Sequence, residues 1–364
     1  MKWNWQKSDW PNFSYDSSKF LELEKKLVHN SGVLFGVFKH LTDENKELLK
    51  IELLTTEALK TSEIEGEYLD RDSIQSSIRR HFGLQTDNRI IKPGEKGISE
   101  MMMDLYKSYE EDLCSEKLFE WHKILMKHRT DLEYIGAYRK CSEPMQIVSG
   151  KIYDPKIHFE APPSSMIDKE MSRFIDWFNN SYNEKKLPIL IRAGITHLYF
   201  ESIHPFEDGN GRIGRALSEK VLAQGLGQPT LIALSTTINK NKNKYYDALE
   251  RANKNNEITD WLTYFSEMVL DSLSYTQKAT EFLLSKAKML DRLYNILNPR
   301  QKKLLLRMFE EGHEGFTGGL SAKNYMSITK ATQPTATRDL SDLVEKGGLR
   351  KTGELKSTRY YLSI

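Results

Sequence analysis

With 364 residues, 39% of them hydrophobic and 29% charged, the chain is too long for one hydrophobic core of roughly 250–300 residues, so we expect two or three domains. A net charge of +2 does not by itself indicate a polyanionic partner, and the absence of any run of about 18 apolar residues excludes a membrane-spanning helix. The start lacks the apolar core of a signal peptide, and Cys114 and Cys141 lack metal-ligand spacing, which together favour a cytoplasmic protein.

The first 31 residues are rich in aromatic side chains and contain Pro11, which interrupts an early helix. We expect an extended lead-in segment that packs its rings on the body of the protein. Apolar residues at helical spacing then predict a succession of helices. The segment after the first predicted helix ends at Gly66, and glycine is a common helix stop. The predicted helices of this part cover residues 41–58, 71–81, 98–109 and 115–128.

The pattern changes after Tyr138, where two short segments rich in strand-forming residues, 145–148 and 156–159, are separated by turn residues. They predict one β-hairpin in an otherwise helical protein. Helical spacing resumes after Pro163 and predicts helices over residues 164–179, 188–202, 211–224, 244–253 and 259–286. The predicted fold class is therefore mainly α, a helical bundle with a β-hairpin flap.

The tail differs from the rest of the chain in pattern and in charge. From residue 298 onward the sequence predicts three helices and then two short strands around Gly353, the outline of a winged helix-turn-helix. Residues 299–364 carry 12 Lys and Arg against 7 Asp and Glu, a net of +5, whereas the remaining residues carry 41 against 44, a net of −3. This contrast favours a separate basic module.

One segment, residues 204–215, combines residue types that packing alone does not require. Gly209 and Gly211 free the backbone to direct successive N–H groups at one point, and such a nest at the start of a helix binds phosphate. Arg212 and Arg215 lie three residues apart on the first turns of that helix, so they share a face. Each guanidinium can hold phosphate oxygens through two parallel bonds.

The other side chains of this segment add a metal ligand and a base. Asp208 supplies a hard oxygen ligand of the kind that Mg²⁺ bound to phosphates requires, and His204 titrates near neutral pH and suits proton abstraction. Asn210 adds a neutral donor, Phe206 is expected to be a buried anchor, and Glu207 is expected to be solvated. A lone Gly-Asn-Gly is usually a turn, but the whole combination predicts a cradle for a di- or triphosphate with a base at its mouth.

Residues 204–215 resemble, without a departure, the active-site motif of the Fic family, His-Pro-Phe-x-Asp/Glu-Gly-Asn-Gly-Arg-x-x-Arg. The resemblance extends over roughly residues 40–270, and the aromatic opening resembles the N-terminal segment of one bacterial branch. It implies a Fic-type bundle that transfers AMP from ATP, with Mg²⁺, to a Ser, Thr or Tyr hydroxyl of a target protein, with His204 as general base. We expect an N-terminal helical region with the inhibitory helix, a Fic catalytic core and a winged-helix domain, over residues 1–110, 111–290 and 291–364.

The resemblance also implies where the nucleotide and the target bind. Asp208 would hold Mg²⁺, and Arg212 and Arg215 would grip the outer phosphates. The other residues implied to bind ATP are Phe206, Gly209, Asn210, Gly211, Gly214, Tyr245 and Asn253. The hairpin would align a target segment by strand pairing, through Ile157, His158, Phe159 and Glu160.

Residues 61–66 resemble the inhibitory motif of the family, Ser/Thr-x-x-x-Glu-Gly/Asn, with Thr61, Glu65 and Gly66 at the defined positions. The motif precedes the active-site segment, as in the branch whose inhibitory helix is N-terminal in the same chain. A carboxylate paired with Arg215 would remove the clamp for the γ-phosphate, so Glu65 would inhibit transfer. Removal of AMP, with Glu65 orienting a water molecule, is a second activity that the sequence leaves open.

Several alternatives remain. The chain could be a relative of such enzymes that transfers a different phosphate-containing group. It could also be a DNA-binding regulator whose Fic body senses nucleotide. The intact His204 favours an enzyme over such a regulator. In the tail, Asp339, Asp342 and Glu345 disfavour DNA binding through the last helix. Self-modification and a homodimer are also left open. His197 is expected to be a satisfied core histidine.

Overall fold

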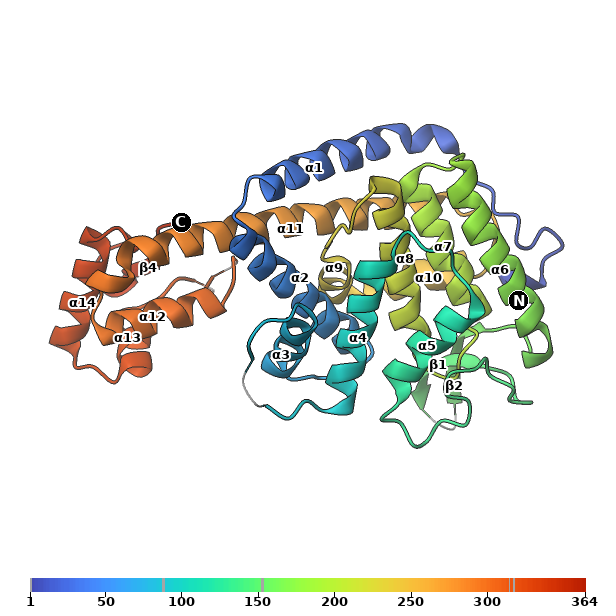
Figure 1. The fold of residues 1–364 in the computed structure, drawn as a ribbon, viewed down its shortest axis with the longest axis horizontal. Helices are drawn as coiled ribbons and strands as arrows, with labels where there is room; N and C mark the ends of the chain where they lie inside the picture. The colour runs from blue at the N-terminus through green and yellow to red at the C-terminus, as the bar shows by residue number, and fades with distance from the viewer. Residues whose placement is uncertain (1, 87–88, 152–153, 314, 317) are drawn as a thin grey trace. The chain divides into compact units, whose positions relative to one another are not determined.

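The computed structural model describes residues 2–86, 89–151, 154–313, 315–316 and 318–364. The chain forms two compact units, Met1–Thr276 and Gln277–Ile364, which are drawn in Figure 1. The predicted fold class is confirmed, because both units are mainly helical and each contains one two-stranded antiparallel sheet among the described residues. Among the described residues, no helix combines the length and the apolar composition that a membrane span requires.

The first unit contains most of the helices and the first hairpin. Its strands are β1 (Gln146–Lys151) and β2 (Asp154–Glu160). Its helices are α1 (Leu21–Lys39), α2 (Asp43–Ile64), α3 (Arg71–His81), α4 (Pro93–Ser108), α5 (Ser115–Met126), α6 (Ser164–Glu184), α7 (Ile189–Ile203), α8 (Asn210–Leu226), α9 (Leu234–Lys240), α10 (Lys242–Ala252) and α11 (Thr259–Leu293), the last of which continues into the second unit.

The prediction of an extended lead-in over the first 31 residues is wrong from Leu21 onward, because α1 begins there. Leu27, Ser31 and Leu34 are buried at spacings of four and three residues, which is the stripe that a helix presents to a core. Two glycines in this helix lower its intrinsic propensity, so packing of the stripe, rather than propensity, explains why it forms.

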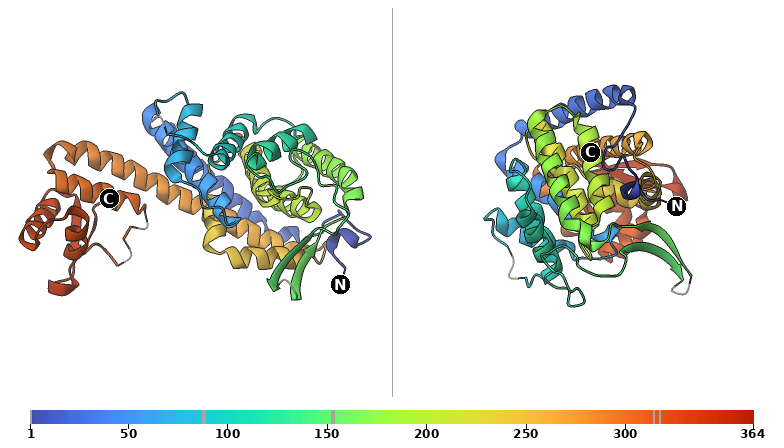
Figure 2. Two further views of the ribbon diagram at one scale, coloured as in Figure 1. Left: turned by 90° about the horizontal axis from the view of Figure 1, so that it is seen from below. Right: turned by 90° about the vertical axis from the view of Figure 1, so that its right-hand side faces the viewer.

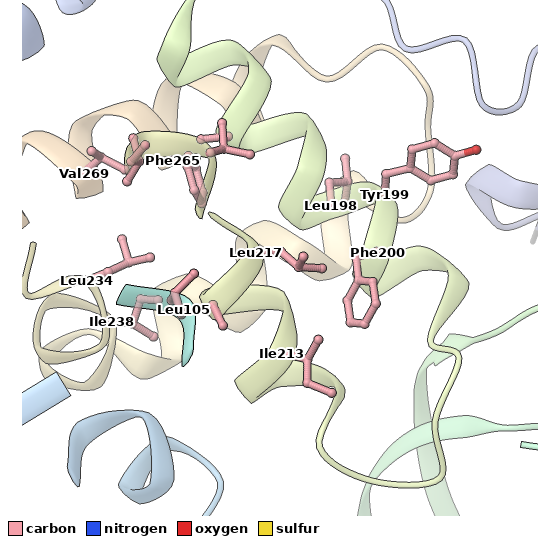
Figure 3. Close-up of a cluster of buried hydrophobic side chains, with 14 of the residues drawn as sticks. Leu105, Leu198, Tyr199, Phe200, Ile213, Leu217, Leu234, Ile238, Phe265 and Val269 are labelled. Carbon is pink, nitrogen blue, oxygen red and sulfur yellow. The ribbon is translucent and has the colours of Figure 1, made fainter. Parts of the chain in front are cut away.

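The centre of the first unit is the pair α7 and α8, which pack against each other. Every residue of α7 from Leu190 to Ile203 is buried, so this helix has no polar face. Figure 3 shows Phe200 from α7 and Ile213 and Leu217 from α8 among the side chains of this core. The segment that joins the two helices is therefore held at both ends by rigid, buried structure.

The β1–β2 hairpin is braced by the N-terminal segment, which lies beside it in the left view of Figure 2. The indole N–H of Trp5 donates to the carbonyl oxygen of Glu160 at 2.7 Å, and the rings of Trp3 and Phe159 meet edge to face at 5.4 Å. Asn4 is fully buried and its side chain donates to Ser202. The aromatic opening thus packs on the body of the unit, as predicted.

The second unit contains α12 (Pro299–Glu310), α13 (Ala322–Thr329), α14 (Gln333–Glu345), β3 (Leu349–Thr352) and β4 (Arg359–Leu362) around its own hydrophobic core. This element order is the predicted one, while the winged-helix assignment itself stays a prediction. The first 110 residues share one core with the rest of the first unit, and the division between the units falls at residues 276 and 277.

Asp339 of α14 does not face solvent as an acidic residue on a DNA-binding surface would. Its residue exposure is 5%, and its carboxylate accepts hydrogen bonds from Arg300, Asn298 and the hydroxyl of Tyr325. Asp342 is paired with Lys346 on the same helix. The acidic excess that the sequence suggested for the last helix is therefore largely neutralised within the unit.

Candidate active site

The segment between α7 and α8 begins with His204 in a left-handed conformation, φ 50° and ψ 61°, as the C-cap of α7. It ends with Gly209, at φ 83°, as the N-cap of α8. A left-handed backbone is costly for a residue with a side chain, so the surrounding contacts must hold His204 in place. Asn210 does part of this, because its side-chain amide both accepts from the N–H and donates to the carbonyl of Phe206, at 2.9 and 2.8 Å. In this structure, then, the Asn210 amide closes the loop.

Two residues that the sequence did not single out anchor the same loop. Arg139 is buried, and its guanidinium donates to the carbonyl oxygens of His204 (2.8 Å) and Pro162 (2.6 Å). His122 stacks on Phe206 with ring centroids 4.2 Å apart. Neither residue belongs to a local pattern, and their roles depend on contacts across more than 60 positions of sequence.

The His204 side chain is 12% exposed, and its Nδ1 atom is buried without a well-aligned hydrogen bond. Burial, together with the positive charge of Arg139, lowers the pKa of His204 to about 4, against the opposing effect of the Glu201 carbonyl. The imidazole is therefore neutral at physiological pH and able to accept a proton.

Arg215 is buried and brings the predicted inhibitory residues to the loop. It donates to Thr61 Oγ1 at 2.8 Å, to the Thr61 carbonyl at 3.0 Å and to Glu65 Oε1 at 2.7 Å. Burial is the largest single effect and would lower the pKa of Arg215, but the Glu65 carboxylate together with Tyr245 and Tyr246 raises it overall. Gly66 follows at φ 83°, where the chain turns away from α2.

Gly211 and Gly214 leave room for these neighbours. A Cβ atom on Gly211 would clash with Glu65 Oε1 and lie 3.0 Å from Arg215. A Cβ atom on Gly214 would lie 2.5 Å from Oε1 of Glu201, so this glycine accommodates a carboxyl group. Gly211 of the motif and Gly214, at one of its unspecified positions, thus both have a packing role in addition to any role toward a nucleotide.

Arg212 and Asp208 also have partners from elsewhere in the chain. Arg212 donates to Glu67 Oε2 at 2.5 Å, and the other oxygen of Glu67 lies 2.9 Å from His128 Nε2. The carboxylate of Asp208 pairs with Arg129 and accepts from the N–H of Gly209. The sequence did not indicate Glu67 or Arg129, although Glu67 lies only two residues after Glu65.

The donor set at this position fits a Mg²⁺ ion that arrives with a polyphosphate. No group of three or more potential metal-binding side chains occurs in the described ranges, and Asp208 is the carboxylate of the loop. Mg²⁺ is commonly held by one or two carboxylates, with phosphate oxygens and water completing its shell. Asp208 could hold such an ion once Arg129 has moved away.

Tyr245 and Asn253 are buried and engaged with protein groups. The Tyr245 hydroxyl lies 2.6 Å from His197 Nε2, and Asn253 accepts a hydrogen bond from Ser202. His197 is fully buried with partners on both ring nitrogens, as predicted for a core histidine, and burial lowers its pKa to about 3. The structure thus gives Tyr245 and Asn253 structural contacts and does not bring them into the loop itself.

The flap residues divide into exposed and engaged ones. Ile157 is 43% exposed, whereas Phe159 is 2% exposed. His158 lies 2.6 Å from Glu250 on α10, and Glu160 accepts from the side chain of Gln146. The apolar surface that the hairpin presents to solvent is therefore on Ile157 and its cross-strand neighbours.

The prediction that Glu207 is simply solvated is wrong. Its carboxylate accepts hydrogen bonds from the N–H groups of Glu133 and Tyr134, at 2.9 and 2.7 Å. Glu207 therefore ties the loop to the segment after α5, whereas the carboxylate of Asp208 pairs with Arg129.

Residues 112–222 match the Fic/DOC family, and residues 3–84 match a domain of unknown function, DUF4172. Among curated proteins, a probable protein adenylyltransferase of Aquifex aeolicus is 30% identical over 149 residues, which are 40% of this chain and 40% of that protein. The protein adenylyltransferase Fic of Drosophila yakuba is 28% identical over 211 residues, which are 55% of this chain and 39% of that protein. The chain thus matches less than half the length of these relatives.

Solved structures give the same fold. A Fic family protein from Desulfovibrio desulfuricans G20 superimposes with a TM-score of 0.52 at 22% identity, covering 93% of this chain and 95% of that one. Fic-1 from C. elegans gives a TM-score of 0.52 at 20% identity, covering 73% and 75% of the two chains. The chain therefore contains a Fic/DOC family domain, in which the segment between α7 and α8 carries the family motif.

Proposed function

We propose that this protein transfers AMP from ATP to a hydroxyl group of a target protein, and that the structure represents its inhibited state. The observation that carries the proposal is the combination of a neutral, mostly buried imidazole at His204 with two arginines on the first turns of α8. The names of the curated relatives support adenylyl transfer. An intact base distinguishes this function from nucleotide sensing alone.

The chemistry assigns one role to each group. The target hydroxyl oxygen would attack the α-phosphorus of ATP while its proton passes to Nε2 of His204. The bond between the α-phosphorus and the bridging oxygen would break, and pyrophosphate would leave. Arg212 and Arg215 would neutralise the outer phosphates, and the first N–H groups of α8 would face the chain of phosphates. Such a reaction depends on positioning and charge neutralisation more than on covalent catalysis.

Asp208 would hold the Mg²⁺ ion of the nucleotide. When bound, this ion would supply positive charge against the phosphates. In the present structure Arg129 supplies positive charge to the same carboxylate, so we propose that Arg129 leaves Asp208 when the nucleotide binds.

The inhibited state rests on the carboxylate of Glu65. The Glu65 carboxylate forms an ion pair with Arg215. It also fills the space beside Gly211 where the backbone could approach a phosphate. Glu67 binds Arg212 in the same way, so both arginines of the cradle are paired with carboxylates that follow α2. Removal of AMP, with Glu65 orienting a water molecule, remains a proposed second activity of the same site.

The test is AMP transfer by the Glu65→Gly variant, with ATP labelled on the α-phosphate and a cell lysate as the source of targets. We expect at least a tenfold rise in protein-bound label over the unaltered chain, since the variant frees Arg215. Glu63→Gly is the matched control, because Glu63 is in the same turn but pairs with Lys60. An unchanged rate for Glu65→Gly would contradict the inhibitory role.

The position of the label separates the proposed reaction from its alternatives. Label on the α-phosphate or adenine that stays on protein indicates adenylyl transfer, whereas transfer of γ-label alone would indicate a kinase-like reaction and would contradict the proposal. A second incubation of labelled target with the unaltered chain, without ATP, measures removal of AMP.

A further inference from the structure

We infer that the carboxyl group of Glu201 positions the imidazole of His204 for proton abstraction. This inference rests on the proposed adenylyl transfer, because it assigns a role in the same reaction. Glu201 lies on the last turn of α7, three residues before His204, and outside the motif that the sequence identified. Its side chain is 9% exposed, and its Oε2 atom lies 3.8 Å from Nδ1 of His204.

Neither side chain has a well-aligned side-chain partner in this position. Oε1 of Glu201 and Nδ1 of His204 are each buried without a well-aligned hydrogen bond, although the backbone carbonyl of Glu201 also lies near the imidazole. An unpaired buried polar atom is costly, so two such atoms on neighbouring side chains need an explanation. The distance of 3.8 Å is longer than a hydrogen bond, and a small rotation of either side chain would bring the atoms into bonding range.

The adjacent helix preserves the space for this carboxyl group. A Cβ atom on Gly214 of α8 would lie 2.5 Å from Oε1 and 3.4 Å from Cδ of Glu201. A side chain at residue 214 would therefore push Glu201 out of its place beside the imidazole. Gly214 of α8 and Glu201 of α7 therefore fit together as one arrangement.

The neighbouring charges connect Glu201 to the inhibitory contact. Burial raises the pKa of Glu201 to about 8, while Arg215 opposes this rise and Glu65 adds to it. At neutral pH the carboxyl group is thus mostly protonated while Glu65 is in place. When Glu65 leaves, an anionic neighbour is lost and Arg215 remains, so the pKa of Glu201 falls and the group ionises more readily.

The charged groups around the imidazole determine how ionisation of Glu201 affects the protonation of His204. Arg139 faces His204 and disfavours its protonated form, whereas Glu65 and Asp208 favour it. Glu65 is displaced in the active state, and the charge of Asp208 is committed to the metal-bound nucleotide. An ionised Glu201 would then accept the Nδ1 hydrogen, leave Nε2 free for the target hydroxyl and stabilise the imidazolium that forms.

The experiment compares Glu65→Gly with the double variant Glu65→Gly/Glu201→Gln. The matched control is Glu65→Gly/Glu219→Gln, because Glu219 is another buried glutamate whose pKa burial raises to about 8, and it is bound to Thr230. We expect Glu201→Gln to lower kcat at least tenfold with KM for ATP changed less than twofold, and to shift the acidic limb of the pH profile. The Glu219→Gln control should keep the kcat and the pH profile of Glu65→Gly.

A second measurement does not depend on activity. Nitrogen chemical shifts of the His204 imidazole, recorded without nucleotide in the Glu65→Gly background, where Glu201 ionises more readily, report which ring nitrogen carries the hydrogen. We expect the population with hydrogen on Nδ1 to fall in Glu201→Gln and to be kept in part by Glu201→Asp, which retains a carboxyl group. Glu201→Asp also serves if the glutamine variant fails to fold.

The results that would overturn the inference differ from those that would overturn the proposed function. If Glu65→Gly transfers no AMP, the proposed function fails, and the imidazole shifts still decide the role of Glu201. If the Glu201 variants match the Glu219 control in kcat, pH profile and imidazole shifts, Glu201 does not position His204.

Discussion

Two buried carboxyl groups, one in each unit, have opposite environments. Asp339 of the second unit accepts hydrogen bonds from Arg300, Asn298 and Tyr325, and these partners lower its pKa although burial alone would raise it. Glu201 of the first unit has a buried oxygen without a partner, and burial raises its pKa to about 8. The first group stabilises a fold, whereas the second costs stability and lies beside the imidazole that we propose as the general base.

This difference indicates where the molecule keeps unsatisfied polar groups. In the first unit they include His204 and Glu201, both next to the α7–α8 loop. Unpaired buried polar atoms also occur elsewhere in the first unit, for example in Thr55 and Ser266, so His204 and Glu201 differ from these by lying next to each other at the loop.

The largest effect is expected for His204→Ala in the Glu65→Gly background. Loss of the general base should reduce AMP transfer by about a thousandfold, in line with the contribution of a positioned base, and leave ATP affinity nearly unchanged. Steady-state kinetics and calorimetric titration with ATP measure the two quantities. His40→Ala is the control, because His40 is an exposed residue at the end of α1 with no role in the site. Retention of most of the rate in His204→Ala would remove the base from the mechanism.

The second prediction concerns stability. Asp339→Ala should reduce the free energy of unfolding of the second unit by about 2 kcal/mol, because the buried hydroxyl of Tyr325 loses its partner. Arg300 is 43% exposed and can return to water, so it adds little to this cost. Denaturant unfolding followed by circular dichroism measures the change, and AMP transfer by the Glu65→Gly parent should not change. A loss smaller than that of Glu345→Ala would show that the Asp339 contacts contribute nothing.

The third prediction gives the two carboxyl groups opposite pH dependence. The pKa of Glu201 in the fold is about 8, above its ordinary value of 4.5, so its stabilising contribution is present below 4.5 and is lost as the pH rises toward 8. Glu201→Gln should therefore gain stability relative to the unaltered chain as the pH rises from 5 to 8. For Asp339 the pKa is lowered below 3.8, so its contribution is present above 3.8 and is lost only in acid. Thermal unfolding of both variants at pH 3, 5 and 8 checks the two signs.

The smallest effect is expected on the flap, where burial is slight. Ile157→Ser removes an exposed apolar contact, worth about 1 kcal/mol, so KM for a protein target should rise about fivefold while KM for ATP stays constant. Leu355→Ser, at an exposed leucine of the second unit, is the control. Equal effects on both KM values would place Ile157 at the nucleotide instead of the target.

The sequence predicted the elements whose signals are local. The helix over residues 71–81, the hairpin and the order of elements in the tail are found as predicted, because caps, turn residues and periodicity lie within each element. Helix α1 was missed, since its glycines and the preceding aromatics obscured a narrow buried stripe. Pattern alone cannot show which partner a helix will find.

The same limit applies to the site. The residues of the α7–α8 loop could be identified from spacing, because their chemistry is contiguous in sequence. Glu67, Arg129 and Arg139 could not, because they reach the loop from 65 to 145 positions away and belong to no repeating pattern. Glu201 was adjacent to the motif, but a carboxylate three residues before a histidine on a helix carries no signal until burial is known.

The position of Asn4 has a practical consequence for preparing the protein. Its backbone N–H donates to the carbonyl of Asn253, its carbonyl accepts from Asn256, and its side chain reaches Ser202 one turn before the loop. A truncation that removes Asn4 and Trp5 would break the contacts of Asn4 with the ends of α7 and α10. It would also break the hydrogen bond from Trp5 to β2. A truncated sample with altered kinetics should therefore not be mistaken for an activated one.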